Sequence, residues 1–192
     1  MRKIELSESN TILFQQLASL REELDSYTLE KYQRINPLFE NLCDWNEKGT
    51  RFGKEGTVLY DSATIIGDVQ IGAHCWIGLN TIIDGTGGLI IGDYVTVSSG
   101  VHIYTHDTVR WALSGGKALY EYSPVTIGNC VFIGAQSVVL RGVGIGEHSL
   151  ICANATVTKD VPPFSIVAGT PARVIGRVII DNDGVKLEYL GR

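Results

Sequence analysis

The chain has 192 residues, long enough for one domain with a sizeable core, and its formal net charge is -5 with a pI near 5.3. This acidic balance argues against a protein built mainly to bind nucleic acid or an anionic membrane surface. The N-terminal residues contain no apolar run long enough for a signal peptide or a membrane span, so we expect no membrane insertion. The cysteines (Cys43, Cys75, Cys130 and Cys152) form no CxxC pair, and we expect reduced thiols in a cytoplasmic protein.

Residues 1–50 are expected to form a helical cap. A helix is predicted over residues 9–24, because leucines recur there on one helical face. These leucines are Leu13, Leu17, Leu20 and Leu24. A second helical stretch should begin near Thr28, with Tyr32 and Ile35 on its buried side.

Pro37 can start a further helical turn that ends before Gly49, with Leu38, Leu42 and Trp45 facing the core. These N-terminal helices most simply cover the first coil of a solenoid, since the end of a solenoid must be covered. A helix that binds a partner protein is the alternative.

From Leu59 onward the sequence repeats with a step of six residues. Aliphatic residues hold one position of each hexad; the phase slips by two residues after Ile83, breaks at Tyr104, and returns in phase after Pro124. These positions are Leu59, Ile65, Ile71, Ile77, Ile83, Ile91, Val97, Ile103, Ile127, Ile133, Val139, Ile145, Ile151 and Val157. Helices and coiled coils have hydrophobic periods near 3.6 and 3.5, so the six-residue period indicates neither.

Six residues fit one short strand and one corner. Gly follows the aliphatic residue in several hexads, as at Gly72 and Gly134, and a corner residue such as Gly can take positive φ without strain. Three sides of six residues make a coil, and stacked coils bury a continuous Ile/Val column. We therefore predict an all-β solenoid, a parallel β-helix, over residues 51–163.

The interruption at about residues 104–124 is expected to be a loop extruded from the coil, because the phase is unchanged after it. Long loops in compact folds are often functional. His106 lies where the chain leaves the coil, so a rigid strand would fix its backbone while the loop partly excludes water, as a catalytic base requires. A solvated insertion without a task is the alternative.

Residues 164–192 are expected to form a C-terminal segment. Pro162 and Pro163 end the last coil, and residues 178–180 and 185–190 indicate a hairpin across an Asp-Asn-Asp-Gly turn. The hairpin should close the end of the β-helix or pack on a neighbouring subunit.

Histidine is the side chain most easily used as a base near neutral pH. His74 and His148 fall at outward-facing hexad positions and are expected to be surface residues, whereas His102 is ambiguous. The sequence has no GxSxG, no P-loop, no GxGxxG opening a helix and no convincing zinc pattern, so we expect no metal.

The hexads, the interrupting loop and the segment TKDVPPFSIVAGTPAR at residues 158–173 together resemble the hexapeptide-repeat acyltransferases. The branch concerned includes the maltose, galactoside, xenobiotic and surface-polysaccharide O-acetyltransferases, and the similarity covers roughly residues 52–178. The resemblance implies a left-handed coil, a homotrimer with active sites between subunits, and acetyl-CoA as the donor. It also implies that His106, in the segment IYTHD, is a general base for direct transfer without an acyl-enzyme.

The resemblance also implies a set of residues that bind the cofactor. Ala135 and Ala153 match positions whose backbone lines the pantetheine channel, where small residues allow close approach. Thr158, Lys159 and Arg173 match residues near the adenosine and phosphate end, where cations suit the charge of CoA.

On the acceptor side, the resemblance places Asn80 and Asp84 near the positions of the Asn and Asp that contact the sugar in the family. Either Asp107 or Glu121 could orient His106, and nothing in the sequence selects between them. The N-terminal region lacks a clear match to the segment that helps bind disaccharide in the maltose and galactoside group.

The chain departs from the family where Cys152, Ala153 and Asn154 replace the usual Gly-Ala-Gly before the terminal TKD. Asn tolerates positive φ, so the corner is expected to survive, but Cys152 narrows whatever passes there.

We therefore expect an acetyl-CoA-dependent O-acetyltransferase that acts on a sugar or sugar-bearing hydroxyl, with a small-molecule or glycan acceptor. The alternatives within the same chemistry are an N-acetyltransferase of an amino sugar and a xenobiotic acetyltransferase. A non-catalytic β-helix scaffold is a further alternative. A metal hydratase resembling the γ-class carbonic anhydrases would need His74, His102 and His106 to converge on a metal from neighbouring subunits.

Overall fold

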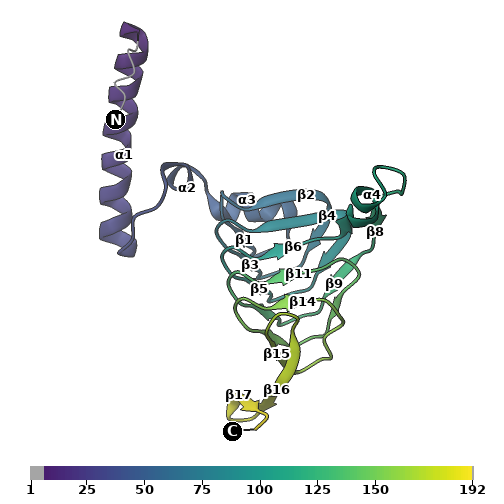
Figure 1. The fold of residues 1–192 in the computed structure, drawn as a ribbon. Coiled ribbons are helices and arrows are strands. Elements are labelled where there is room, and N and C mark those ends of the chain that lie inside the picture. The colour runs from purple at the N-terminus through teal and green to yellow at the C-terminus, as the bar shows by residue number, and fades with distance from the viewer. Residues whose placement is uncertain (1–6, 192) are drawn as a thin grey trace. The chain divides into compact units, whose positions relative to one another are not determined.

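The computed structural model describes residues 7–191 and divides the chain into two compact units, Met1–Asp44 and Trp45–Arg192 (Figure 1). The first unit holds two helices. They are α1 (Glu8–Tyr32) and α2 (Leu38–Leu42). The second unit holds the remaining helices and all the strands of the described chain.

Helix α1 is one continuous helix, where two helical stretches were expected from the sequence. Ser7 caps its N-terminus by accepting a hydrogen bond from the backbone of Asn10, and Gln33 ends it in the left-handed conformation. No Gly or Pro lies between these caps, so nothing interrupts the helix at Thr28.

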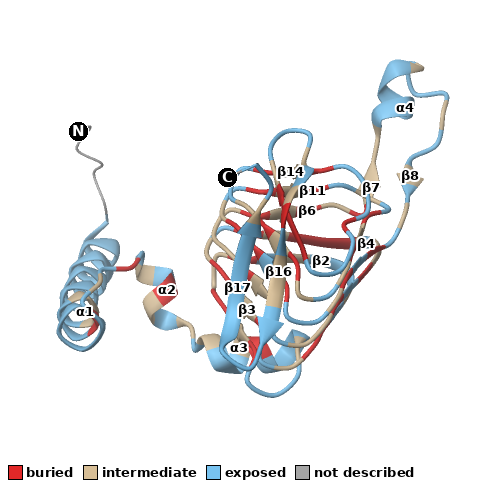
Figure 2. Ribbon diagram, turned by 90° about the horizontal axis from the view of Figure 1, so that it is seen from below, coloured by how far each residue is buried: buried red, intermediate tan, exposed pale blue. Residues whose placement is uncertain are grey.

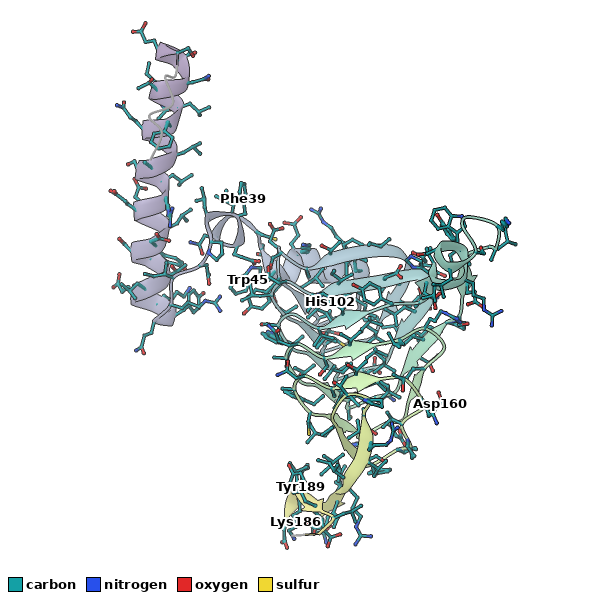
Figure 3. All side chains as sticks on the ribbon, in the orientation of Figure 1. Phe39, Trp45, His102, Asp160, Lys186 and Tyr189 are labelled. Carbon is teal, nitrogen blue, oxygen red and sulfur yellow. The ribbon has the colours of Figure 1, made fainter. Side chains whose placement is uncertain are left out.

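Most apolar side chains of α1 are exposed within the first unit. Leu13 is 53% exposed and Tyr32 52% exposed, and Thr28 is the buried residue of the helix. Ile35, also expected to be buried, is 64% exposed. Figure 3 shows side chains projecting on all sides of α1. The physical reason is that, within this unit, the five-residue α2 offers too little surface to cover a 25-residue helix.

Helix α3 (Trp45–Phe52) covers the first coil of the β-helix. The Trp45 ring stacks on Tyr60 at 4.3 Å, and Lys48 Nζ donates to the carbonyl oxygens of Tyr60 and Asp61 at 3.1 and 2.5 Å. The helix runs through Gly49 instead of ending before it. Gly49 allows the helix to pack closely on the coil, because a Cβ there would lie 1.9 Å from the carbonyl oxygen of Thr57. Part of the predicted helical cap is therefore packed directly on the solenoid.

The second unit is a left-handed parallel β-helix with three faces, as expected. The first face stacks β1 (Val58–Leu59), β3 (Trp76–Ile77), β5 (Thr96–Val97), β10 (Phe132–Ile133), β13 (Leu150–Ile151) and β15 (Ser165–Ala168). The second stacks the first halves of β2 (Thr64–Ile71) and β4 (Ile82–Ile91) on β6 (His102–Ile103), β11 (Val138–Val139) and β14 (Thr156–Val157). The third joins the second halves of β2 and β4 to β9 (Val125–Ile127) and β12 (Gly144–Ile145).

The hexad aliphatics fill the centre of the coils, as predicted. Ile77, Ile83 and Ile133 are fully buried, and among the predicted positions Ile65 alone is only partly buried. Figure 2 shows buried residues on the strands around the interior of the β-helix. Burying each such side chain stabilises the fold by about 1.5–3 kcal/mol, so the column accounts for much of the driving force.

The repeated glycines serve a different purpose from the one expected. A Cβ at Gly72 would lie 2.5 Å from the carbonyl carbon of Gly92, and a Cβ at Gly134 would lie 2.5 Å from the nitrogen of Ala153. These glycines therefore allow successive coils to stack closely. Positive φ is instead adopted at other corner positions, mostly by larger residues. They include His74, Asn80, Tyr94, Cys130, Gln136, His148, Asn154 and Phe164.

The two-residue slip lies in β4, at the corner between the second and third faces. Its pairing with β2 passes from Gly67–Gly85 to Val69–Leu89, so the extra residues of β4 bulge at this corner. Asp84 stands at the start of the bulge and is 1% exposed.

The predicted loop leaves the coil at the same corner and projects from the β-helix in both ribbon views (Figures 1 and 2). It contains β7 (His106–Asp107), α4 (Val109–Leu113) and β8 (Glu121–Tyr122), and β7 pairs antiparallel with β8. The coil then resumes at β9, so the loop is extruded as predicted.

The predicted terminal hairpin is also present. It consists of β16 (Arg173–Asp181) and β17 (Gly184–Tyr189), with Ile180 opposite Val185. Strand β16 pairs antiparallel with β15 and so continues the first face beyond the last coil. No helix in the described part of the chain is long and apolar enough to cross a membrane.

Candidate active site

His106 is held by a carboxylate at the corner from which the loop departs. Its Nδ1 lies 2.6 Å from Oδ2 of Asp84, which comes from the bulge of β4 on the coil above. The His106 side chain remains one third exposed (33%), whereas that of Asp84 is 1% exposed. A buried carboxylate thus meets a histidine that is still accessible to a ligand.

The surroundings of Asp84 keep it ionised. Burial raises the pKa of Asp84, but hydrogen bonds from Thr86, from the backbone of Thr105 and from His106 outweigh it, so the net pKa is lower than usual. The backbone of Thr86 donates at 2.9 Å, its hydroxyl donates to the same oxygen, and the backbone of Thr105 donates at 3.2 Å.

An ionised Asp84 fixes the tautomer of His106. Because a carboxylate can only accept, the proton of the neutral imidazole resides on Nδ1, and Nε2 keeps a lone pair for an incoming proton. The arrangement is that of a general base oriented by a buried acid. The buried carboxylate of Asp84, a residue expected on the acceptor side, contacts His106.

A cavity of about 350 Å³ opens beside His106. It is lined by Tyr104, His106, Asp107, Leu140, Arg141 and Thr158. These residues come from the same corner of three successive coils. The fold therefore brings Thr158, expected at the cofactor, into one pocket with His106.

Asp107 and Glu121, the residues expected to orient His106, bind Arg141 instead. Arg141 Nε donates to Asp107, and its Nη2 donates to Glu121 Oε2 at 2.8 Å. The hydrogen bond from Arg141 holds the pKa of Asp107 below its usual range. Asp107 lies on β7 and Glu121 on β8, so one arginine of the coil beneath anchors both strands of the loop.

Arg141 was not found from the sequence. In the sequence, Arg141 is a cation that follows Leu140 at a corner, and a cation in such a position is usually a solvated surface residue. Its contact with Asp107 spans 34 positions, and no local pattern indicates it.

Lys159 and Arg173 both line a second cavity, of about 230 Å³, near the end of the β-helix, together with Asp160. Val157, Val161, Ala172 and Val174 contribute its apolar walls. Both cations are exposed, and Lys159 directly follows Thr158 of the His106 pocket. The polar residues predicted to bind the cofactor, Thr158, Lys159 and Arg173, therefore lie close together.

Ala135, Ala153 and Asn80 lie at a different corner, between the first and second faces. The backbone of Asn154 donates to Ala135 at 2.9 Å, so the two alanine-bearing corners are stacked, and Asn154 adopts φ 58° as expected. Asn80 is exposed, and its backbone donates to Ser62. The single chain does not bring these three residues into the His106 pocket.

Cys152 is half-buried at the same corner, and burial raises the pKa of its thiol. A thiol with a raised pKa stays protonated at neutral pH and is a poor nucleophile.

The other histidines make local contacts. His74 stacks on Tyr94 at 4.8 Å and His148 on Phe164 at 4.9 Å. His102, labelled in Figure 3, lies 3.3 Å from the hydroxyl of Tyr104 through its Nδ1. Within residues 7–191, no three His, Cys, Asp or Glu side chains gather in a way that could hold a metal ion.

Two family models match the β-helix. One, described as the bacterial transferase hexapeptide (six repeats), matches residues 124–159; the other, the hexapeptide repeat of succinyl-transferase, matches residues 68–105. The loop and the terminal hairpin lie outside both matches.

Curated relatives match over the same region. The galactoside O-acetyltransferase of Escherichia coli is 38% identical over 117 residues, which cover 60% of this chain and 57% of that protein. The chain spans about half the length of the curated relatives it matches.

Solved structures share the fold. A hexapeptide-repeat acetyltransferase from Vibrio cholerae aligns with a TM-score of 0.57 and 26% identity over 84% of this chain and 92% of that one. An N-acyltransferase from Bacillus cereus, solved with dTDP and coenzyme A, aligns with a TM-score of 0.56 over 69% of this chain and 89% of that one. Its identity of 21% supports similarity of fold alone.

Proposed function

The expected resemblance to the hexapeptide-repeat acyltransferases is confirmed, and on that premise we propose that the chain transfers an acetyl group from acetyl-CoA to a hydroxyl of a sugar or sugar-bearing acceptor. The observation that carries the proposal is the pair formed by His106 and the buried, ionised Asp84 beside an open cavity.

In the proposed reaction, Nε2 of His106 takes the proton of the acceptor hydroxyl while the hydroxyl oxygen attacks the thioester carbonyl. The new C–O bond forms and the C–S bond breaks as the tetrahedral intermediate collapses. The imidazolium then returns the proton to the departing thiolate, so His106 ends neutral and CoA leaves as a thiol. Asp84 stabilises the imidazolium that forms between the two steps.

For the donor, we assign the phosphate end of acetyl-CoA to Lys159 and Arg173, the cations at the second cavity. Thr158 links this end to the pocket of His106, so the thioester would point toward the base. Ala135 and Ala153 would contact the pantetheine arm, because their small side chains allow the arm to approach the backbone closely.

The position of those alanines supports a homotrimer. Ala135, Ala153 and Asn80 lie at one corner of the coil and His106 at another, so one chain cannot bring both sets to a single cofactor molecule. In a closed threefold assembly, the corner that carries the two alanines and Asn80 on one subunit would face the corner that carries His106 on the next. Each site would then take His106 from one subunit and the two alanines from the next.

A hydroxyl acceptor is favoured over an amine by the orientation of the base. A neutral amine attacks a thioester without prior deprotonation, whereas a hydroxyl needs its proton removed during attack. His106, whose tautomer is fixed by Asp84, can remove that proton through Nε2. We keep N-acetylation of an amino sugar as the second candidate.

Titration calorimetry with acetyl-CoA tests the donor. We expect one site per subunit with micromolar affinity, weakened about tenfold or more in Lys159→Ala/Arg173→Ala because both cations face the phosphates. Lys186→Ala in the terminal hairpin is the matched control, and we expect it to bind like the wild type. No binding at millimolar acetyl-CoA would refute the proposal. We expect the protein in the cytoplasm, where its donor is made.

A further inference from the structure

The extruded loop contains a cavity of its own that the proposed reaction does not use. Its volume is about 540 Å³, and its lining includes Trp111, Lys117, Leu119, Tyr120 and Tyr122. This volume falls within the range of about 300–1,000 Å³ typical of small-molecule sites.

The aromatic rings of this cavity are held at defined angles. Trp111 and Tyr120 meet edge to face, with ring centroids 5.6 Å apart and planes at 87°. Trp111 is 42% exposed and Tyr120 45% exposed, so each ring still presents surface to a ligand. Two perpendicular apolar walls suit a ring with one flat apolar face, such as the C–H face of a pyranose.

Tyr122 connects this cavity to the catalytic base. Its ring stacks on His106 with a centroid distance of 6.0 Å and an angle of 26°, and the two residues are register partners in the β7–β8 pair. A ligand bound against Tyr122 would therefore be separated from the imidazole by one aromatic ring. The cavity is placed to hold the part of an acceptor that adjoins its reacting hydroxyl.

Lys117 gives the cavity a charge. The Ser114 hydroxyl oxygen accepts hydrogen bonds from the backbone of Lys117 at 3.1 Å and of Ala118 at 2.8 Å, and this fixes the turn that carries the lysine. Lys117 has no carboxylate partner among residues 7–191.

The carboxylates closest in the loop are already neutralised. Asp107 and Glu121 both bind Arg141, and Glu121 also lies 3.4 Å from Nε of Arg110. The cation of Lys117 is therefore left for a ligand, in a chain whose net charge is -5.

From the perpendicular rings, the unneutralised cation and the contact with His106, we propose that this cavity is an acceptor subsite for a saccharide that carries an acidic group. One sugar ring packs on Trp111 and Tyr120, its acid group meets Lys117, and a hydroxyl of the adjoining residue reaches past Tyr122 to His106. This assignment rests on the proposed transferase function and narrows its acceptor class.

The test compares ligands that differ only in charge. Methyl glucuronide and methyl galacturonide are titrated against methyl glucoside and methyl galactoside by NMR at low ionic strength, with wild type, Lys117→Gln and Lys54→Gln. Lys54 is an exposed lysine of the first coil, so its variant matches the change in net charge. We expect an acidic glycoside to bind the wild type and Lys54→Gln about fivefold more tightly than its neutral counterpart, and Lys117→Gln to lose that difference.

Trp111→Ala should weaken both members of each pair, because it removes the apolar wall and not the charge. Equal binding of acidic and neutral glycosides to wild type, a preference that survives in Lys117→Gln, or no binding of either kind would overturn the assignment. A uridine diphosphate sugar that binds more tightly than the acidic glycosides would also overturn it, since it would identify a nucleotide site.

Failure here is separable from failure of the transferase proposal. Binding is measured without acetyl-CoA and also in His106→Ala, which we expect to bind acidic glycosides and to transfer nothing. Transfer to neutral glycosides with an equal kcat/KM would overturn the acidic subsite and leave the transferase intact.

Discussion

Asp84 Oδ2 and His106 Nδ1 lie 2.6 Å apart although the two residues are separated by 22 positions in the sequence. The contact exists because the bulge of β4 and the start of the loop occupy the same corner of neighbouring coils. A polar pair whose partners come from two adjacent rigid coils has little freedom to reorient, which is what a catalytic base needs.

Replacing Asp84 by Asn should impair catalysis without displacing His106. The amide no longer stabilises an imidazolium and can donate to Nδ1, which would place the proton on Nε2, the wrong nitrogen. We expect kcat to fall by about 10²-fold or more, with the affinity for acetyl-CoA unchanged. Steady-state kinetics and calorimetry check the two halves of this prediction, and a kcat within threefold of wild type would contradict it.

The stability of the β-helix should depend on the charge of Asp84 at low pH. Because the pKa of Asp84 is lower in the folded chain than its usual value near 3.9, the ionised form stabilises the fold above that value. This contribution is lost as the pH falls through the lowered pKa of the folded state. Thermal unfolding between pH 6 and pH 3 should therefore show a smaller fall of Tm in Asp84→Asn than in wild type. Parallel curves would contradict the expectation.

Arg141 should anchor the loop rather than take part in chemistry. In Arg141→Met, the carboxylates of Asp107 and Glu121 lose their partner, and we expect faster hydrogen exchange over residues 106–122 and a lower kcat/KM for the acceptor. The donor affinity should stay unchanged. Arg177→Met is the matched control, because Arg177 pairs with Glu188 in the exposed hairpin. Unchanged exchange in the loop would show that Arg141 is not its anchor.

The hexad glycines should be intolerant of a methyl group. In Gly134→Ala, the added Cβ would meet the backbone of Ala153 at 2.5 Å, and the coils would have to separate. We expect the free energy of unfolding to fall by about 1–3 kcal/mol. The matched control is Gly144→Ala, where the nearest atom, Thr126 Oγ1, lies at 3.5 Å. Urea denaturation measures both, and equal stability of the two variants would contradict the account of coil stacking.

The β-helix, its extruded loop and the terminal hairpin were predictable because each leaves a local trace. The hexad aliphatics point inward at every coil, the unchanged phase after Pro124 identifies the loop, and the Asp-Asn-Asp-Gly turn identifies the hairpin. Such signals depend only on residues near each other in the sequence.

The partner of His106 was not predictable for the opposite reason. The two-residue slip begins just after Asp84, so the alignment with the family is ambiguous there, and the contact of Asp84 with His106 spans 22 positions. Asp107 lies beside His106 in the sequence, yet its carboxylate binds Arg141, a contact across 34 positions. The exposed leucines of α1 are a second example of a contact that the sequence does not identify. An apolar stripe on a helix predicts that some surface covers it, but does not say which surface.

The most direct test of the central claim is acetyl transfer itself. The purified chain is incubated with acetyl-CoA and a panel of glycosides, and release of the CoA thiol is followed together with the mass of the acceptor, in wild type and His106→Ala. We predict thiol release coupled one to one to an acceptor heavier by one acetyl group, reduced at least about 10²-fold in His106→Ala. Transfer that persists in His106→Ala at the rate of wild type would contradict the assignment of His106 as the base.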